Sequence, residues 1–228
     1  EKIESIKKNI SYNSDITSME LKQVKKNNIY SMDSISEIKN CDYIIICLPT
    51  PLNKNQPDMS YIIKAFNTMY KFLRKNQTLI LESSVYPGAT KDIFLKKLSE
   101  KFLVGKNFYL GYSPERIDPG QKNLTPYKDI TKLVSGYSAK CQKKIFELYK
   151  KIFKKIYQTK TIEIAEFSKL FENTYRSVNI GLVNEIKILS NKMGIDMNEI
   201  ISAASTNPFG FTPFKPGPGM GGHCIPID

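Results

Sequence analysis

Short apolar runs alternate with stretches of helical period through the first two thirds of the chain, and this alternation limits its fold more than any other feature. The run at 41–48 is continuously apolar from Tyr43 and stops at Pro49, which is typical of a strand buried on both faces. Strands joined by helices form βαβ units and a parallel sheet. We therefore expect a partial doubly wound α/β sheet, with strands at 41–48, 78–84, 108–112 and 132–135 and helices at 60–75, 90–102 and 138–154.

Polar side chains follow three of these strands. Ligands of a parallel α/β sheet bind beyond the carboxyl ends of its strands, so these loops mark the expected crevice. Pro49 and Thr50 follow the first strand, Ser84 the second, and Glu115 and Arg116 the third. A carboxylate such as Glu115 can act as a base or orient water, and an arginine can bind a phosphate or carboxylate. The alternative is a salt bridge between the two loop residues.

From about residue 161 the character of the chain changes. Apolar side chains recur every three or four residues over 163–193, which predicts one helix of about 46 Å. A helix of that length usually crosses between domains or between subunits. We expect a division into 1–160 and 161–228, and a homodimer formed through helix 163–193.

The limits of this long helix, and of the next one, are also readable. Gly194 ends the first, and Asp196 can cap a second helix over 197–204. Gly181, in the middle of the long helix, costs roughly 1 kcal/mol. That cost is tolerable where another helix packs close to the glycine.

Lys169 and Asn173 are four residues apart on the long helix and therefore project from one face. An ammonium beside an amide can stabilise an oxygen that gains negative charge. Arg176, on the same helix, could reach a substrate phosphate or a partner chain. The alternative for all three is a solvated helix surface.

The tail 207–228 holds five of the twelve glycines and five of the twelve prolines, so it is neither helix nor strand. Cys224 lies in this setting, which favours a nucleophile over a buried structural cysteine. Asp228 is near enough in sequence to act on a water. His223, the only histidine, is either a base or a residue that shapes the loop. The other cysteines, read as structural, are Cys41, Cys47 and Cys141.

Composition narrows the function classes. The net charge of +12 admits anionic partners, but the lysines are scattered through expected helices rather than clustered. No apolar run has the length of a membrane span, and the cysteines show no secreted or CxxC pattern. We expect a cytoplasmic protein with no nucleic-acid or membrane partner. A single histidine argues against a metal site.

Taken together, the motifs resemble the nucleotide-sugar dehydrogenases, the family of UDP-glucose and UDP-N-acetylhexosamine 6-dehydrogenases. The matching stretches occur in the family's order and cover most of the chain from about residue 44. The third and fifth look more like the branch that acts on UDP-N-acetylated hexosamines. They are IIICLPTPL (44–52), LESSVYPGAT (81–90), YSPERIDPG (112–120), AEFSKLFENTYRSVNIGLVNEI (165–186) and FGFTPFKPGPGMGGHCIPID (209–228).

The resemblance implies a Rossmann-like NAD-binding domain, a long connecting helix and a helical catalytic region. It also implies NAD-dependent, four-electron oxidation of a sugar C6 alcohol to a carboxylate through a thioester on Cys224. By this match Lys169 and Asn173 stabilise the oxyanion, Asp228 assists proton transfer, and Glu115 handles water and protons. The other implied positions are Pro49, Thr50, Ser84 and Glu115 for NAD, and Arg116, Arg176, Phe214, Gly221 and His223 for the UDP-sugar.

The sequence also departs from the family. Pro119 stands where the glucose branch carries a second glutamate, so water activation cannot be copied across whole. No expected strand leads into a GxGxxG loop, so the first βαβ unit that binds the dinucleotide is expected to be missing. The family's UDP-binding domain follows the stretch that ends here at Asp228, and it is expected to be missing as well. We therefore expect a central fragment of a longer enzyme.

Several other functions stay open at this point. UDP-glucose is the alternative substrate, and a two-electron β-hydroxyacid dehydrogenase, which needs no thiol, is the alternative enzyme. Outside catalysis, the chain could be an inactive fragment that dimerises through its long helix, or a basic nucleic-acid-binding module.

Overall fold

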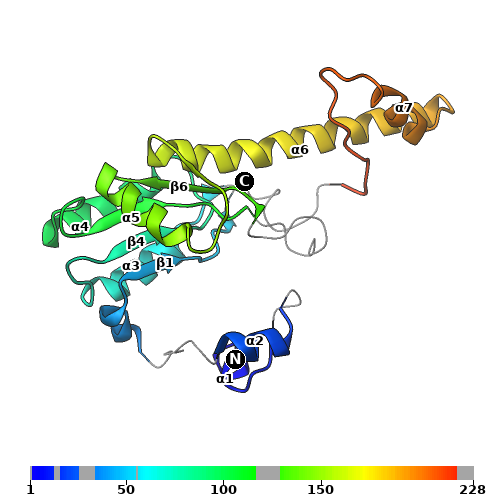
Figure 1. Ribbon diagram of the computed structural model, residues 1–228. Helices are drawn as coiled ribbons and strands as arrows, with labels where there is room; N and C mark the ends of the chain where they lie inside the picture. Colours follow the sequence, from blue (N-terminus) through cyan, green and yellow to red (C-terminus); the bar gives the residue numbers. More distant parts are fainter. Residues whose placement is uncertain (1, 13–15, 26–33, 55, 117–128, 220–228) are drawn as a thin grey trace. The chain divides into compact units, whose positions relative to one another are not determined.

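The computed structural model of the protein describes residues 2–12, 16–25, 34–54, 56–116 and 129–219 (Figure 1). By its internal contacts the chain divides into two compact units. The first consists of Glu1–Thr50 and Asp58–Glu166, and the second of Pro51–Pro57 and Phe167–Asp228.

A five-stranded sheet forms the centre of the first unit. Its strands lie in the order β1-β4-β5-β6-β7. The first three are parallel, with Tyr43 opposite Thr78 and Thr78 opposite Tyr109. Their bounds are Tyr43–Ile46 (β1), Thr78–Leu81 (β4), Tyr109–Tyr112 (β5), Lys132–Gly136 (β6) and Ile156–Gln158 (β7).

The expected α/β fold is confirmed, but the expectation of a fully parallel sheet is wrong at β6. This strand runs antiparallel to β5, with Gly111 opposite Gly136, and β7 runs parallel to β6. Antiparallel neighbours need no crossover helix, and the sequence between β5 and β6 has no helical period. β7 was not predicted, and it forms the edge of the described sheet opposite β1.

Helices cover the two faces of this sheet unequally. On one face, α3 (Ser60–Tyr70) and a helix made of a π segment (Lys91–Leu95) and α4 (Lys96–Lys101) enclose the larger core. On the other face, α5 (Ala139–Tyr149) packs on β4, β5, β6 and β7 around Ile80, Val134 and Ile145 (Figure 1).

The prediction that the first strand is buried on both faces is also wrong. Ile44 and Ile46 point into the larger core and are buried, but Ile45, between them, is 44% exposed. The reason is that β1 lies at the edge of the described sheet, and the main contacts of α5 do not extend to it.

Two glycines let α5 approach the sheet closely. A Cβ atom on Gly111 would lie 2.1 Å from the Ile145 side chain and 2.2 Å from the Ser135 carbonyl oxygen. A Cβ atom on Gly136 would lie 2.2 Å from the Gln142 backbone nitrogen. Neither position has room for a side chain.

The expected long helix, which begins in the first unit and continues in the second, and the helix after it are confirmed. They are α6 (Ile162–Lys192) and α7 (Met197–Ala204). The Asp196 side chain caps α7 by accepting from the Asn198 N–H at 2.9 Å, and Gly194 adopts φ +71° where α6 ends. A Cβ atom on Gly181 would meet nothing within 4 Å in the described chain, so the expected close neighbour is not within it.

The remaining elements are short. They are α1 (Lys2–Lys7), α2 (Ser18–Lys25), a 3-10 helix (Ile35–Asn40), and a hairpin of β2 (Leu52–Asn53) and β3 (Gln56–Pro57). None of the helices in the described ranges has the apolar length of a membrane span.

Candidate functional site

The loops after β1 and β4 are joined at the carboxyl edge of the parallel strands. The Leu48 N–H donates to Ser83 Oγ at 2.9 Å, and Thr50 Oγ1 donates to the Ser84 carbonyl oxygen at 2.8 Å. Ser83 is buried, Thr50 and Ser84 are half-buried, and Pro49 is exposed. The structure therefore brings Thr50 and Ser84, two of the predicted site residues, together at the edge where such sheets bind ligands.

Glu115, which follows β5, is held by both carboxylate oxygens. Its Oε2 lies 3.2 Å from the Lys132 ammonium, and its Oε1 accepts from the Arg116 N–H at 2.7 Å. The Arg116 guanidinium donates to the Thr131 carbonyl oxygen at 2.9 Å. The Glu115 side chain is 45% exposed, so water can reach it.

Lys132 belongs to a cluster of charged and polar side chains that sequence reasoning missed. Its side chain is only 3% exposed, and its ammonium also lies 3.0 Å from Glu82 Oε1. The Tyr149 hydroxyl donates to the same oxygen of Glu82, and the Lys132 ammonium lies 5.2 Å from the Tyr149 ring centroid. Burial and the neighbouring Glu82 carboxylate raise the pKa of Tyr149, so its hydroxyl stays protonated and keeps donating.

The three cysteines in the described ranges are free thiols, in line with the structural reading. Cys141 is fully buried, and Ser138 Oγ donates to its sulfur at 3.3 Å. Cys47 is exposed, and its thiol donates to Glu82 Oε2 at 3.4 Å. Loss of solvation and the Glu82 carboxylate raise the pKa of Cys47 to about 12, so this thiol is a poor nucleophile at neutral pH.

Glu166 was not predicted either. Its carboxylate is buried and accepts from the Gly88 N–H at 2.6 Å, the Thr90 N–H at 2.9 Å and Thr90 Oγ1 at 2.6 Å. These N–H groups belong to the start of the helix that runs through α4, where a negative charge is favoured. Burial nonetheless raises the pKa of Glu166. The sequence signal that could have pointed to an acceptor here is the N-terminus of that helix, because the first N–H groups of a helix need an acceptor.

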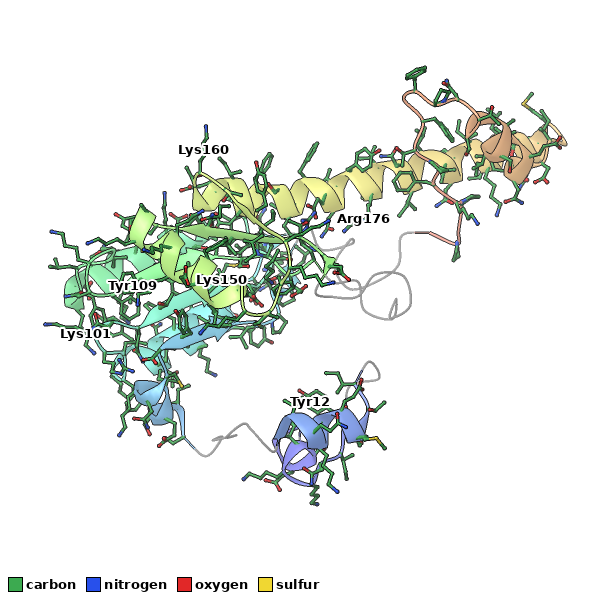
Figure 2. The ribbon with its side chains drawn as sticks, in the orientation of Figure 1. Tyr12, Lys101, Tyr109, Lys150, Lys160 and Arg176 are labelled. Carbon is green, nitrogen blue, oxygen red and sulfur yellow. The ribbon has the colours of Figure 1, made fainter. Side chains whose placement is uncertain are left out.

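The residues predicted on α6 are Lys169, Asn173 and Arg176, and they lie on one face of the helix. Asn173 is buried, Lys169 and Arg176 are half-buried, and an Arg176 Nη2 group donates to Asn173 Oδ1. Figure 2 labels Arg176 on this helix. An arginine can only donate, so the atom it meets must be the amide oxygen. The Asn173 NH₂ group is therefore presented on the other side of the amide, as a donor.

Phe214 packs within the second unit. Its ring meets the Tyr175 ring edge-on, with centroids 5.9 Å apart, and it borders the cluster of Val183, Met197 and Ile201. Close by, the Gly217 N–H donates to Asn184 Oδ1 at 2.9 Å. These contacts fix part of the glycine-rich tail to α6. An apolar groove lies here between α6, α7 and the tail.

Cys224, Asp228, Gly221 and His223 lie outside the described residues. The stretch 217–222 does have the glycine spacing of GxGxxG, but no strand precedes it in the described part of the tail. It is therefore not the fingerprint of a βαβ unit. Within the described ranges, no three His, Cys, Asp or Glu side chains gather as a metal site would require.

The chain is similar to known proteins over its whole length. Residues 1–156 match the model of the UDP-glucose/GDP-mannose dehydrogenase family, NAD binding domain, and residues 163–228 match the model of its central domain. Over its whole length the chain is 38% identical to Protein CapL of Staphylococcus aureus and 38% identical to the UDP-N-acetyl-D-glucosamine 6-dehydrogenase of Salmonella typhi. It covers 53% of each, so it spans about half the length of these relatives.

A solved structure, the UDP-D-ManNAc dehydrogenase of Pyrococcus horikoshii, matches 98% of the chain with a TM-score of 0.90 and 30% identity. The chain covers 54% of that protein. The resemblance drawn from the sequence motifs is thereby confirmed, and the chain belongs to the UDP-glucose/GDP-mannose dehydrogenase family.

Proposed function

We propose that the protein to which this chain belongs oxidises the C6 alcohol of a UDP-N-acetylhexosamine to the uronate, with NAD as the oxidant. The observation that carries the proposal is the match to both family domains, in order, along the chain. The names of the relatives from Salmonella typhi and Pyrococcus horikoshii support an N-acetylated substrate over UDP-glucose. We assign residues 1–160 to the NAD-binding domain and 161–228 to the central region.

The residues at the carboxyl edge of β1, β4 and β5 fit the nicotinamide end of NAD. Half-buried hydroxyls at Thr50 and Ser84 and the half-exposed Glu115 are groups that a ribose or carboxamide can bind. Pro49, Thr50, Ser84 and Glu115 would hold the cofactor there. When bound, NAD supplies the hydride acceptor for both oxidation steps.

Cys224 supplies the nucleophile of the proposed reaction. The first oxidation converts the C6 alcohol to an aldehyde, and the Cys224 sulfur adds to its carbon while Asp228 takes the thiol proton. The second oxidation leaves a thioester, and water, oriented by Glu115, displaces the sulfur as the carboxylate forms. One alcohol and one water thus become one carboxylate, with two hydrides and three protons released.

Lys169 and Asn173 stabilise the oxygen that becomes negative when the sulfur or water adds. The contact between Arg176 and Asn173 supports this role, because it turns the amide NH₂ into a fixed donor. Arg116, Arg176, Phe214, Gly221 and His223 are assigned to the UDP-sugar. A reducing, cytoplasmic setting suits a reaction that needs the Cys224 thiol free.

We further propose a homodimer formed through helix 163–193. The residues that support it are apolar, lie along one face of α6, and are 46–64% exposed. Gly181 lies beside this stripe with open space over it, which suits the close approach of a second helix. The stripe consists of Phe167, Phe171, Tyr175, Val178, Leu182, Leu189 and Met193.

The test uses protein expressed from the complete reading frame and a panel of UDP-sugars, with NADH and the sugar acid both measured. We expect two NADH per acid with a UDP-N-acetylhexosamine, and Cys224→Ser to stop acid formation. A preference for UDP-glucose would correct the substrate. Full acid formation by Cys224→Ser, or one NADH per sugar, would instead favour a two-electron dehydrogenase of the β-hydroxyacid type.

A further inference from the structure

We propose that Lys132 is a positioning residue, which holds the Glu115 carboxylate in place for the water step. This inference rests on the proposed function above, and it concerns a residue on β6 that is separated from Glu115 by 16 intervening positions in the sequence. Lys132 does not reach the reacting atoms itself, because its side chain is buried.

The first argument is the cost of the buried ammonium. A lysine side chain that is 3% exposed must be paired, because an isolated buried charge is strongly unfavourable. Glu82, whose side chain is 13% exposed, lies 3.0 Å away and would neutralise it alone. Neutralising the buried Lys132 charge therefore does not require the second contact, with Glu115.

The second argument is geometric. The Lys132 ammonium lies over the rings of Tyr149 and Phe153, 5.2 Å and 5.5 Å from their centroids, and these rings limit where it can move. Glu82 is itself fixed, since Tyr149 donates to its Oε1 and Cys47 to its Oε2. Lys132 is thus held on one side by a rigid cluster and presents its charge to Glu115 on the other.

The third argument is the division of exposure within the cluster. From Glu82 to Glu115 the side-chain exposure rises from 13% to 45%, so the ammonium links a buried carboxylate to one that water can reach. Lys132 binds the Oε2 atom of Glu115 and the Arg116 N–H binds Oε1, which together set the plane of the carboxylate. A fixed plane is what a group that orients water needs, since small displacements of catalytic groups are costly.

The experiment compares Lys132→Met with Lys132→Arg in the complete protein. We expect Lys132→Met to lower kcat about 100-fold with KM within about threefold, and Lys132→Arg to recover most of the loss, because it keeps the charge and the reach. Because hydrolysis would become slow, the uronyl thioester should accumulate on Cys224 and appear as an added mass on that peptide. Lys150→Met is the matched control. That lysine follows α5 on the surface, pairs with Glu147 and is labelled in Figure 2.

Folded Lys132→Met protein with unchanged kcat and no thioester would overturn the proposal. Should Lys132→Met fail to fold, Tyr149→Phe decides, because it keeps the ring and removes only the hydroxyl that holds Glu82. A kcat about fivefold lower with thioester on Cys224 supports the proposal, and an unchanged kcat overturns it.

A separate measurement distinguishes this inference from the proposed function. Crystal structures of wild type and Lys132→Met should show the Glu115 carboxylate displaced in the variant. If the wild type oxidises no UDP-sugar but the carboxylate moves, the proposed function fails and the positioning stands. If the carboxylate stays in place, the positioning fails whatever the activity.

Discussion

Glu166, in the second turn of α6, accepts hydrogen bonds from the backbone N–H groups of Gly88 at 2.6 Å and Thr90 at 2.9 Å. The contact ties the start of the long helix to the loop after β4. Glu166→Ala leaves the buried Thr90 N–H and the half-buried Gly88 N–H without this acceptor, so we expect the free energy of unfolding of the first unit, measured in urea, to fall by about 3 kcal/mol. Glu163→Ala removes a partly exposed ion pair with Lys91 and should cost under about 1 kcal/mol. Equal losses would contradict this account.

The same carboxylate predicts a pH dependence. Burial raises the pKa of Glu166 above 4.5 in the folded protein, so its protonated form is favoured by folding. Its contribution to stability is present below pH 4.5 and is lost as the pH rises through the higher folded value. Between pH 4 and neutrality, the free energy of unfolding should therefore fall more for wild type than for Glu166→Gln. Parallel curves would show that Glu166 keeps an ordinary pKa.

Cys47 should be inert toward alkylation. A pKa of about 12 leaves the thiolate population at pH 8 roughly a thousandfold below that of an ordinary cysteine. We expect iodoacetamide at pH 8 to modify exposed Cys41 long before Cys47, as measured by peptide mass spectrometry. Glu82→Gln removes the neighbouring carboxylate and should speed the reaction of Cys47. Similar rates at both cysteines in wild type would contradict the prediction.

We expect Arg176 to affect catalysis through its contact with Asn173. Replacing it with Met removes the guanidinium that donates to Asn173 Oδ1, so we expect kcat for the proposed oxidation to fall about tenfold. Lys192→Met, at the exposed end of the same helix, is the control and should leave kcat unchanged. A fall in kcat that Arg176→Lys restores fully would instead assign Arg176 a charge effect, because lysine is not expected to reproduce this contact.

The apolar stripe of α6 predicts the state of assembly. We expect wild type to have the mass of a dimer by light scattering, and Phe171→Lys with Val178→Lys to convert it to a monomer. Both side chains are more than 60% exposed, so the change should not disturb the folded subunit. Lys187→Glu changes charge on the opposite side of the helix and should keep the dimer. A monomeric wild type would remove the proposal.

The elements with long local patterns were predictable, and those set by distant neighbours were not. α6 was expected at 163–193 and lies at Ile162–Lys192, because its apolar spacing runs unbroken up to Gly194. β7 has only three residues beside a lysine-rich stretch, and its pairing with β6 defines it. Likewise, the direction of β6 depends on the path of the chain before it and not on its own residues.

The residues of the candidate site likewise fall into those that the sequence predicts and those that it does not. Residues in the loops after strands, such as Thr50 and Ser84, were predictable because parallel strands end at one edge. Lys132 and Glu82 were not, because a charged residue at a strand terminus ordinarily faces water. Only the folded chain shows that they meet 3.0 Å apart across 50 residues of sequence.

Gly111 and Gly136 also bear on the charged cluster, although neither has a functional group. The clearance they leave sets how deeply α5 lies on the sheet, and Tyr149 at its last turn reaches Glu82 from that depth. Even one methyl group at either position would lift or tilt the helix. The absence of a side chain at these two positions therefore sets the depth of α5 on the sheet. The alignment of Glu82, Lys132 and Glu115 depends on that depth.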